Sequence, residues 1–313
     1  MESMRTAPTP ERPPFFERHV VRVVLGIAIA MTLLGAAGAW YLLGSSGHPL
    51  TVDRALDRFR GAGPAAAVPA PPGSTSPGSS PSPHPSASPS SGARAVGGRS
   101  PRSSSAATAS HSEPAEGVYV FDTQGSEHTD ALSGQTHTYP SQTTMTIEHA
   151  GCGQVARWQP LSERWDESEV CKTVRGVALH RFSMYHEFFH RGTREDFACG
   201  SNAIVMPWKQ VTGDHWSFRC HSAQTTLDMG VRVVGFEQVP VGGKSVRAVH
   251  IRYEGSVTGA DQGTQIQDRW LSTDVGMFLR ITSSADVMTS TSFGRFHYTE
   301  NYRLDLTSTS PRR

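Results

Sequence analysis

The sequence predicts a mainly β protein, in which an antiparallel meander forms a curved half-barrel or barrel, preceded by one transmembrane helix and a disordered linker. Three observations support this prediction. Residues 296–306 alternate in polarity, residues 23–43 carry no charged side chain, and residues 61–116 are dominated by Pro, Ser, Gly and Ala. A period of two is typical of a half-buried strand. A long uncharged segment is typical of a membrane helix, and a segment poor in apolar residues is typical of disorder.

The uncharged segment, residues 23–43, is long enough to cross a membrane, because a helix of about 20 residues spans a hydrocarbon core of about 30 Å. Arg18 and Arg22 lie directly before it. We therefore expect a cytoplasmic tail at residues 1–22, a single pass through the cell membrane, and an extracytoplasmic remainder. The alternative is a cleaved signal peptide with a small-residue site at residues 37–39, but Trp40 and Tyr41 continue the apolar run beyond that site. Either alternative exports the rest of the chain.

Residues 44–116 are expected to form a juxtamembrane stem followed by the disordered linker. Val52, Leu56 and Phe59 recur at helical spacing, which predicts a short amphipathic helix at residues 51–60 that rests at the lipid surface. Residues 61–116 contain no Phe, Trp or Tyr and have too little apolar surface to offset the entropy of ordering. As a flexible coil this segment would span roughly 40 Å. We expect it to be a tether that holds the following domain away from the membrane.

Residues 117–309 are expected to form the extracytoplasmic β domain. At its C-terminal end, five of the six alternate positions from 296 to 306 are apolar and the intervening residues are polar. Val249, Ile251 and Tyr253 repeat this pattern. Further strands are predicted at residues 118–121, 143–149, 154–158, 231–237, 266–271 and 277–283. Turns at residues 150–151, 242–243 and 273–276 separate them, which indicates a meander rolled into a barrel or a curved sheet.

All four cysteines lie in this domain, and an even number is typical of disulfides in an oxidising compartment. Four cysteines allow three pairings. We favour Cys152–Cys171 and Cys199–Cys220, because a hairpin that turns near residues 161–162 places Cys152 opposite Cys171. A tetrathiolate zinc site is the alternative, but the sequence has no Cys-x-x-Cys pair.

The C-terminal part of the domain, residues 239–306, contains three recognisable features. A VGGK motif at residues 241–244 leads into a strand, a connection at residues 255–263 is bounded by glycines, and DRWLS at residues 268–272 precedes GMFLR at residues 276–280. These features resemble the half-barrel, lipoprotein-carrier-like proteins of the cell envelope. The arginine- and alanine-rich composition and the anchor-plus-tether layout are similar to envelope proteins of high-GC Gram-positive bacteria. The resemblance implies a curved antiparallel sheet able to hold an apolar ligand, although the disulfide-bearing first half departs from the carrier pattern.

Residues 186–190 read His-Glu-Phe-Phe-His, which matches the H-E-x-x-H signature of zinc peptidases. On a helix, His186 and His190 would share one face and bind Zn²⁺, and Glu187 would act as the base on the metal-bound water. On a strand the two histidines would lie roughly 13 Å apart, too far to share one ion. Residues 177–185 are poor in strong helix formers and lack a cap, so we predict a strand here, and no catalytic or metal-binding residue.

Five tryptophans of the β domain are aromatic side chains that could line a groove for a sugar or a lipid. Filling of the core between strands is the more usual role of such large side chains, and we favour it. The residues are Trp158, Trp165, Trp208, Trp216 and Trp270.

A net charge of +1 and the lack of a basic run argue against a nucleic-acid partner. No cofactor is expected, since no phosphate-binding glycine loop is present. The sequence therefore predicts a membrane-anchored extracytoplasmic domain with a binding or structural role in the cell envelope. Candidate partners, besides the membrane itself, are a lipid, a wall polymer or an envelope protein. An extracytoplasmic zinc metallohydrolase is the alternative function, and the sequence favours a protein that is not an enzyme.

Overall fold

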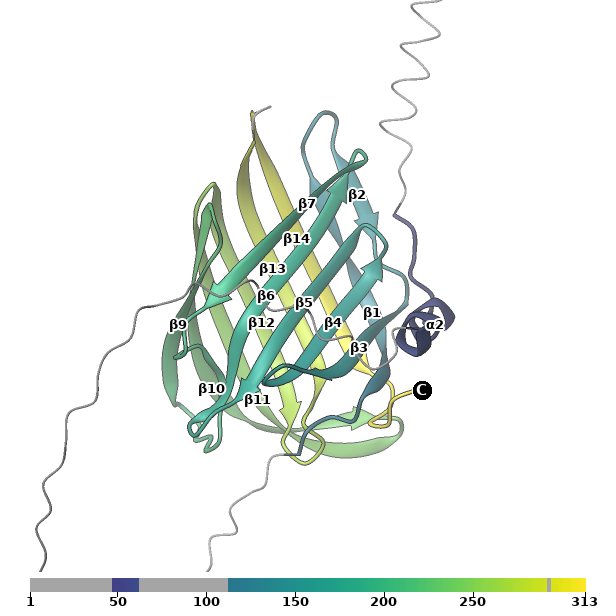
Figure 1. Ribbon diagram of the computed structural model, residues 1–313, viewed down its shortest axis with the longest axis vertical. Coiled ribbons are helices and arrows are strands. Elements are labelled where there is room, and N and C mark those ends of the chain that lie inside the picture. Colours follow the sequence, from purple (N-terminus) through teal and green to yellow (C-terminus); the bar gives the residue numbers. More distant parts are fainter. Residues whose placement is uncertain (1–46, 62–111, 292–293) are drawn as a thin grey trace, which may run out of the picture.

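A computed structural model describes residues 47–61, 112–291 and 294–313, and in this part of the chain one antiparallel sheet closes into a barrel. Twelve strands follow one another around the wall, and closure comes from pairing of the first with the last, from Phe121↔Leu306 to Thr129↔Tyr298 (Figure 1). The prediction of a β meander is therefore confirmed, and of its two predicted forms, a curved half-barrel or a barrel, the structure has the closed barrel. The wall strands are β1 (Gly117–Thr129), β3 (Gln142–Ala150), β4 (Gly153–Leu161), β5 (Arg164–Lys172), β6 (Gly176–Phe188), β7 (Arg191–Cys199), β9 (His215–His221), β10 (Thr225–Val241), β11 (Lys244–Gly259), β12 (Asp261–Ser272), β13 (Met277–Thr291) and β14 (Gly294–Leu306).

Two short strands complete the sheet. β2 (Gln135–Thr138) pairs with the upper half of β1, and β8 (Ile204–Pro207) pairs with the lower part of β6. In Figure 1 the upper end of the barrel carries the turns β1–β2 and β6–β7, and the lower end carries the turns β3–β4, β5–β6 and β12–β13. These short strands extend the wall where β3 and β7 do not reach.

Closure of the barrel requires a very close approach of β1 to β14. Gly125 lies opposite Tyr302 with a φ of 143°, and a Cβ built there would lie 2.2 Å from the carbonyl oxygen of Asn301. A side chain at position 125 would therefore push the two strands apart. Along β14, Tyr302, Leu304 and Leu306 are buried and the residues between them are not, as the period of two predicts.

The lower end of the barrel is covered by the long β10–β11 hairpin. A bulge between Val233 and Gly235 shifts its register, and bulges bend the strand that carries them. Beyond the bulge, Val239 and Val241 pack in one core cluster with Phe121 of β1 (Figure 1). The hairpin turns at the predicted Gly242-Gly243 pair, where both glycines have positive φ. The barrel thus has a floor built from its own strands.

One seam in the wall is short. β7 and β9 are joined by two residue pairs, Ala198↔His221 and Cys199↔Cys220, whereas β6 and β7 are joined by eight residue pairs. The Cys199–Cys220 disulfide lies in this seam. Nearby, the indole of Trp216 on β9 donates a hydrogen bond of 2.6 Å to the carbonyl of Ile204 on β8. This disulfide therefore holds the wall where the hydrogen-bonded ladder is shortest.

The amphipathic helix expected at residues 51–60 is present as α2 (Val52–Gly61). Its apolar side packs on the barrel, where Leu50, Ala55 and Leu56 form a core cluster with Val118 of β1. The preceding residues also join the sheet, because the amide of Leu50 donates to the carbonyl of Pro160 at 3.2 Å. Residues 47–61 are thus part of the barrel unit and not the stem at the lipid surface that their sequence predicts. The domain also extends past residue 309, since Val118 forms a bridge with Arg312.

The predicted tail and transmembrane helix at residues 1–43, and residues 62–111 of the predicted linker, lie outside the described residues. Within the described residues, α2 is the longest helix, and it is too short and too polar to cross a bilayer.

Candidate functional site inside the barrel

The interior of the barrel contains a cavity of about 200 Å³. Its lining is mainly apolar and comes from strands on all sides, including Ile147, Val170, Phe182, Met229 and Phe278. Several of these side chains are only partly buried although they face inward, because they border the open space. A volume of roughly 150 Å³ is enough to bind benzene in an apolar protein cavity, so this one can hold a somewhat larger apolar group.

The lower edge of the cavity is crossed by the chain that enters the barrel. Ser112 donates a backbone hydrogen bond of 3.1 Å to Thr273 in the β12–β13 turn, and Glu113 forms an ion pair of 2.7 Å with Lys172 at the end of β5. Ser112, Glu113, Pro114 and Lys172 belong to the lining. The segment directly before β1 therefore narrows the lower mouth of the cavity.

Above the cavity lies a group of buried ionisable side chains, which we call the charge cluster: Glu127, His137, Tyr139, Arg164, Asp166, His186, Tyr298 and Glu300. Its centre is a pair of glutamates, Glu127 on β1 and Glu300 on β14, which are directly opposite each other in the sheet. Arg164, at the start of β5, lies between the carboxylates. Its guanidinium donates to Glu300 at 3.0 Å and to both oxygens of Asp166 at 2.5 and 2.9 Å, and its Nε is 3.7 Å from Glu127.

The imidazoles and phenols of the cluster surround the same two glutamates. His137 Nδ1 lies 2.9 Å from one oxygen of Glu127, and His186 Nδ1 lies 2.8 Å from the other. Tyr298 donates to Glu127 at 3.1 Å, and Tyr139 donates to Glu300. Both oxygens of Glu127 are therefore satisfied although its side chain is completely buried.

These contacts push the pKa values of the two glutamates apart. Burial raises the pKa of Glu127, but hydrogen bonds from His137 and His186 and the charge of Arg164 outweigh it and lower the pKa to about 2. Burial raises the pKa of Glu300, and the nearby charge of Arg164 offsets this only in part. Glu127 is thus held as a carboxylate, and Glu300 retains a proton more readily than a free glutamate does.

The charge cluster forms the polar upper boundary of the cavity rather than an open reaction centre. Asp166 is the one member that belongs to the cavity lining, whereas Glu127, His137 and Arg164 have at most 2 % of their surface exposed. Its members come from five different strands or their ends, so the network ties the upper half of the barrel together.

The His-Glu-Phe-Phe-His segment is a strand and a turn, as predicted. His186 lies on β6 and points to Glu127 inside the barrel, whereas Glu187 accepts a hydrogen bond of 2.8 Å from Tyr185 on the other face. Phe189 and His190, with φ values of 53° and 59°, form the β6–β7 turn. The helix that the zinc alternative requires is therefore replaced by a conformation that separates its expected ligands, His186 and His190.

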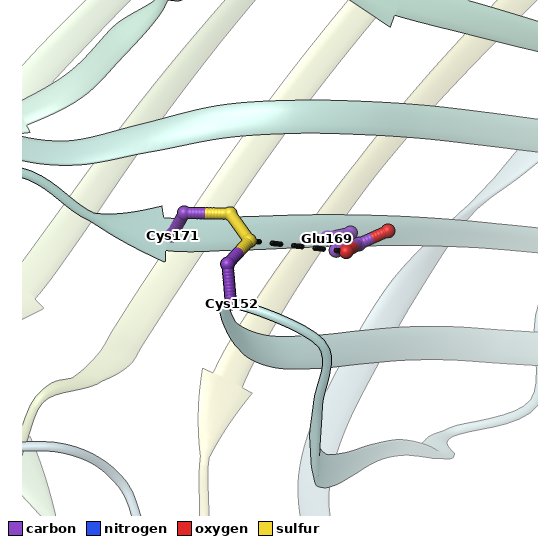
Figure 2. Close-up of side chains that lie close together, drawn as sticks. All are labelled: Cys152, Glu169 and Cys171. Atoms are coloured by element: carbon purple, nitrogen blue, oxygen red, sulfur yellow. Dashed lines mark hydrogen bonds between the residues drawn. A yellow bond between two sulfur atoms is a disulfide. The ribbon is translucent and has the colours of Figure 1, made fainter. Parts of the chain in front are cut away.

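The cysteines form the two predicted disulfides, Cys152–Cys171 and Cys199–Cys220. Figure 2 shows the first of them beside Glu169, whose Oε1 lies 3.9 Å from the Cys152 sulfur. These three side chains bring possible metal-ligand atoms close together. Both sulfurs are used in the disulfide, however, and zinc is bound by thiolates, so the arrangement is structural.

Two of the five tryptophans, Trp158 and Trp208, line the cavity. Trp158 is almost fully buried, and its indole donates to Thr143 at 3.0 Å. Trp165 instead stacks with Tyr185, and Trp270 stacks with His250. The groove of aromatic side chains, which the sequence analysis gave as the alternative to core filling, is thus limited to two rings of the interior lining.

Sequence comparisons place this chain in no family: no family model matches it, and no curated protein matches it. Among solved structures it is similar to the hypothetical lipoprotein YmcC from Escherichia coli (K12), with 12% sequence identity and a TM-score of 0.26. That match covers 56% of this chain and 83% of the other. A similarity this low carries no information on function. Of the resemblance to half-barrel envelope proteins, the structure itself supports only a barrel-like β domain.

Proposed function

We propose that this protein is a binding protein that holds an apolar or amphiphilic ligand inside its barrel. The cavity of about 200 Å³ with its apolar lining is the observation that supports this proposal. Concave, mainly apolar sites with a few polar groups are the usual form of small-molecule binding sites. The export predicted from residues 23–43 would place this function in the cell envelope.

The closure of the cavity at its two ends supports a binding role. The charge cluster closes the upper side through mutual hydrogen bonds and ion pairs that leave only the buried Nε2 of His137 without a partner among its described members, and the β10–β11 hairpin covers the lower end. A ligand in the cavity would therefore leave water and contact mainly side chains such as Leu179 and Phe182. Burial of apolar surface then supplies the binding free energy, about 25 cal/mol per Å².

A cavity-filling substitution tests the proposal. Val170 lines the cavity from β5, so Val170→Trp should occupy the space that a ligand needs. Val174 is 97 % exposed in the β5–β6 turn, and Val174→Trp is the matched control. The measurement is calorimetric titration of the full chain in phospholipid nanodiscs with 1-octanol, corrected with empty nanodiscs.

The unmodified chain and Val174→Trp should bind octanol saturably and with equal affinity, and Val170→Trp should bind at least roughly tenfold more weakly, since one steric clash readily exceeds about 1.4 kcal/mol. Equal affinity for the two tryptophan variants, or the lack of saturable binding in the unmodified chain, would contradict a ligand site in the barrel.

A further inference from the structure

One arginine faces the cavity. Arg269 lies on β12, opposite Ile251 of β11 and Ile281 of β13, and its side chain belongs to the cavity lining. Its guanidinium carbon lies 4.8 Å from the ring centre of Tyr253 and 5.2 Å from that of Phe278. A full positive charge thus lies among aromatic rings in a mainly apolar chamber.

The other charged side chains of the cavity lining form ion pairs, whereas Arg269 has no carboxylate partner. Lys172 pairs with Glu113, and Asp166 is held through both oxygens by Arg164. Among the ion pairs of the described residues, none includes Arg269. Because an uncompensated charge in an apolar interior is costly, its presence indicates a place where an anion completes the site.

The orientation of Arg269 is fixed by its neighbours. Its Nε donates to the side-chain oxygen of Gln267, and the Gln267 amide in turn donates to the hydroxyl of Tyr302 at 3.0 Å. This leaves the two terminal nitrogens of the guanidinium without a carboxylate. A planar guanidinium presents paired donors that match the two oxygens of a carboxylate.

We propose that the ligand is a carboxylate amphiphile, with its carboxylate bound by Arg269 and its apolar chain in the cavity. This inference rests on the proposed function and specifies the class of ligand. The aromatic rings of Tyr253 and Phe278 stabilise the cation by cation–π contact when the site is empty. The carboxylate replaces that weak stabilisation with charge-assisted hydrogen bonds.

The test compares two probes that share a chain and differ in charge. Octanoate and 1-octanol are titrated calorimetrically, near neutral pH, into the full chain in phospholipid nanodiscs, with empty nanodiscs as the blank. Octanoate should bind roughly ten- to a hundredfold more tightly than octanol, which is the range expected for hydrogen bonds between charged groups. In Arg269→Gln this preference should vanish while the affinity for octanol is kept, and Arg269→Lys should retain part of it.

Arg219→Gln is the matched control, because Arg219 lies on the outer wall with 69 % of its side chain exposed and pairs with Asp228. This variant should keep the preference for octanoate. Unchanged octanol binding in Arg269→Gln also shows that the cavity is intact. If octanol binds and octanoate binds no more tightly, or if Arg269→Gln keeps the preference, the assignment of Arg269 is overturned and the proposed function stands. If neither probe binds, the proposed function itself fails.

Discussion

Glu127 should make the stability of the barrel depend on pH, and Glu127→Gln should remove the part of that dependence that Glu127 supplies. The pKa of Glu127 falls from the ordinary value of 4.5 to about 2 in the folded chain, where His137 and His186 donate to it against the opposing effect of burial. A lowered pKa in the folded state stabilises the protein above the unfolded pKa, and this stabilisation is lost as the pH falls from about 4.5 to about 2. At 1.36 kcal/mol per pKa unit, this corresponds to about 3 kcal/mol.

The assay is urea unfolding followed by tryptophan fluorescence at about pH 6 and about pH 2.5. At the higher pH, Glu127→Gln should be less stable than the unmodified chain by about 3 kcal/mol, and at the lower pH the two should converge, because the protonated glutamate resembles glutamine. Glu254→Gln is the control, since the Glu254 side chain is 63 % exposed and surface pairs contribute little. If the curves of Glu127→Gln and the unmodified chain run parallel between these pH values, the reasoning about Glu127 is refuted.

Two further predictions concern the barrel wall. Arg164→Leu should lower the free energy of unfolding by about 3–5 kcal/mol, because it leaves the buried carboxylates of the charge cluster without their cation, and the urea midpoint should fall by about 1–2 M; a loss below about 1 kcal/mol would show that the cluster does not depend on this charge. Replacing Cys199 and Cys220 by serine should cost about 3 kcal/mol and accelerate amide hydrogen exchange in β7 and β9, which share two residue pairs. The same replacement of Cys152 and Cys171 should leave exchange in β4 and β5 slow, since these strands pair along most of their length, and equal acceleration in both cases would contradict a weak β7–β9 seam.

Much of the fold could be predicted, because local sequence patterns indicate where its strands and turns lie. The alternation at residues 296–306 identified β14, and the glycine turns at residues 242–243 and 273–276 separated the correct strands. The disulfide pairing followed from the β4–β5 hairpin alone. The sequence could not decide between a half-barrel and a closed barrel, because the β1–β14 pairing that closes the barrel joins segments far apart in the sequence, and local periodicity carries no information on such a pairing.

The charge cluster was missed for a similar reason. Glu300 is the one polar residue among the six inward positions of β14, and this exception to the pattern was the available signal. Its partners Glu127 and Arg164 come from strands that precede it by more than a hundred residues. The apolar face of α2 could not show whether the helix packs on lipid or on the barrel, because both surfaces are covered by the same apolar side chains.

Docking of residues 47–61 changes what the proline- and serine-rich segment can do. Gly61 ends a helix that lies on the barrel, and the amide of Ser112 is hydrogen-bonded to the β12–β13 turn. Residues 62–111 therefore connect two points of the same domain and do not form the tether between the membrane and the barrel. If an anchor ends at Leu43, only three residues separate it from Gly47, and the chain between these two residues can span at most roughly 14 Å. Such a barrel would sit directly on the outer leaflet, where amphiphiles concentrate.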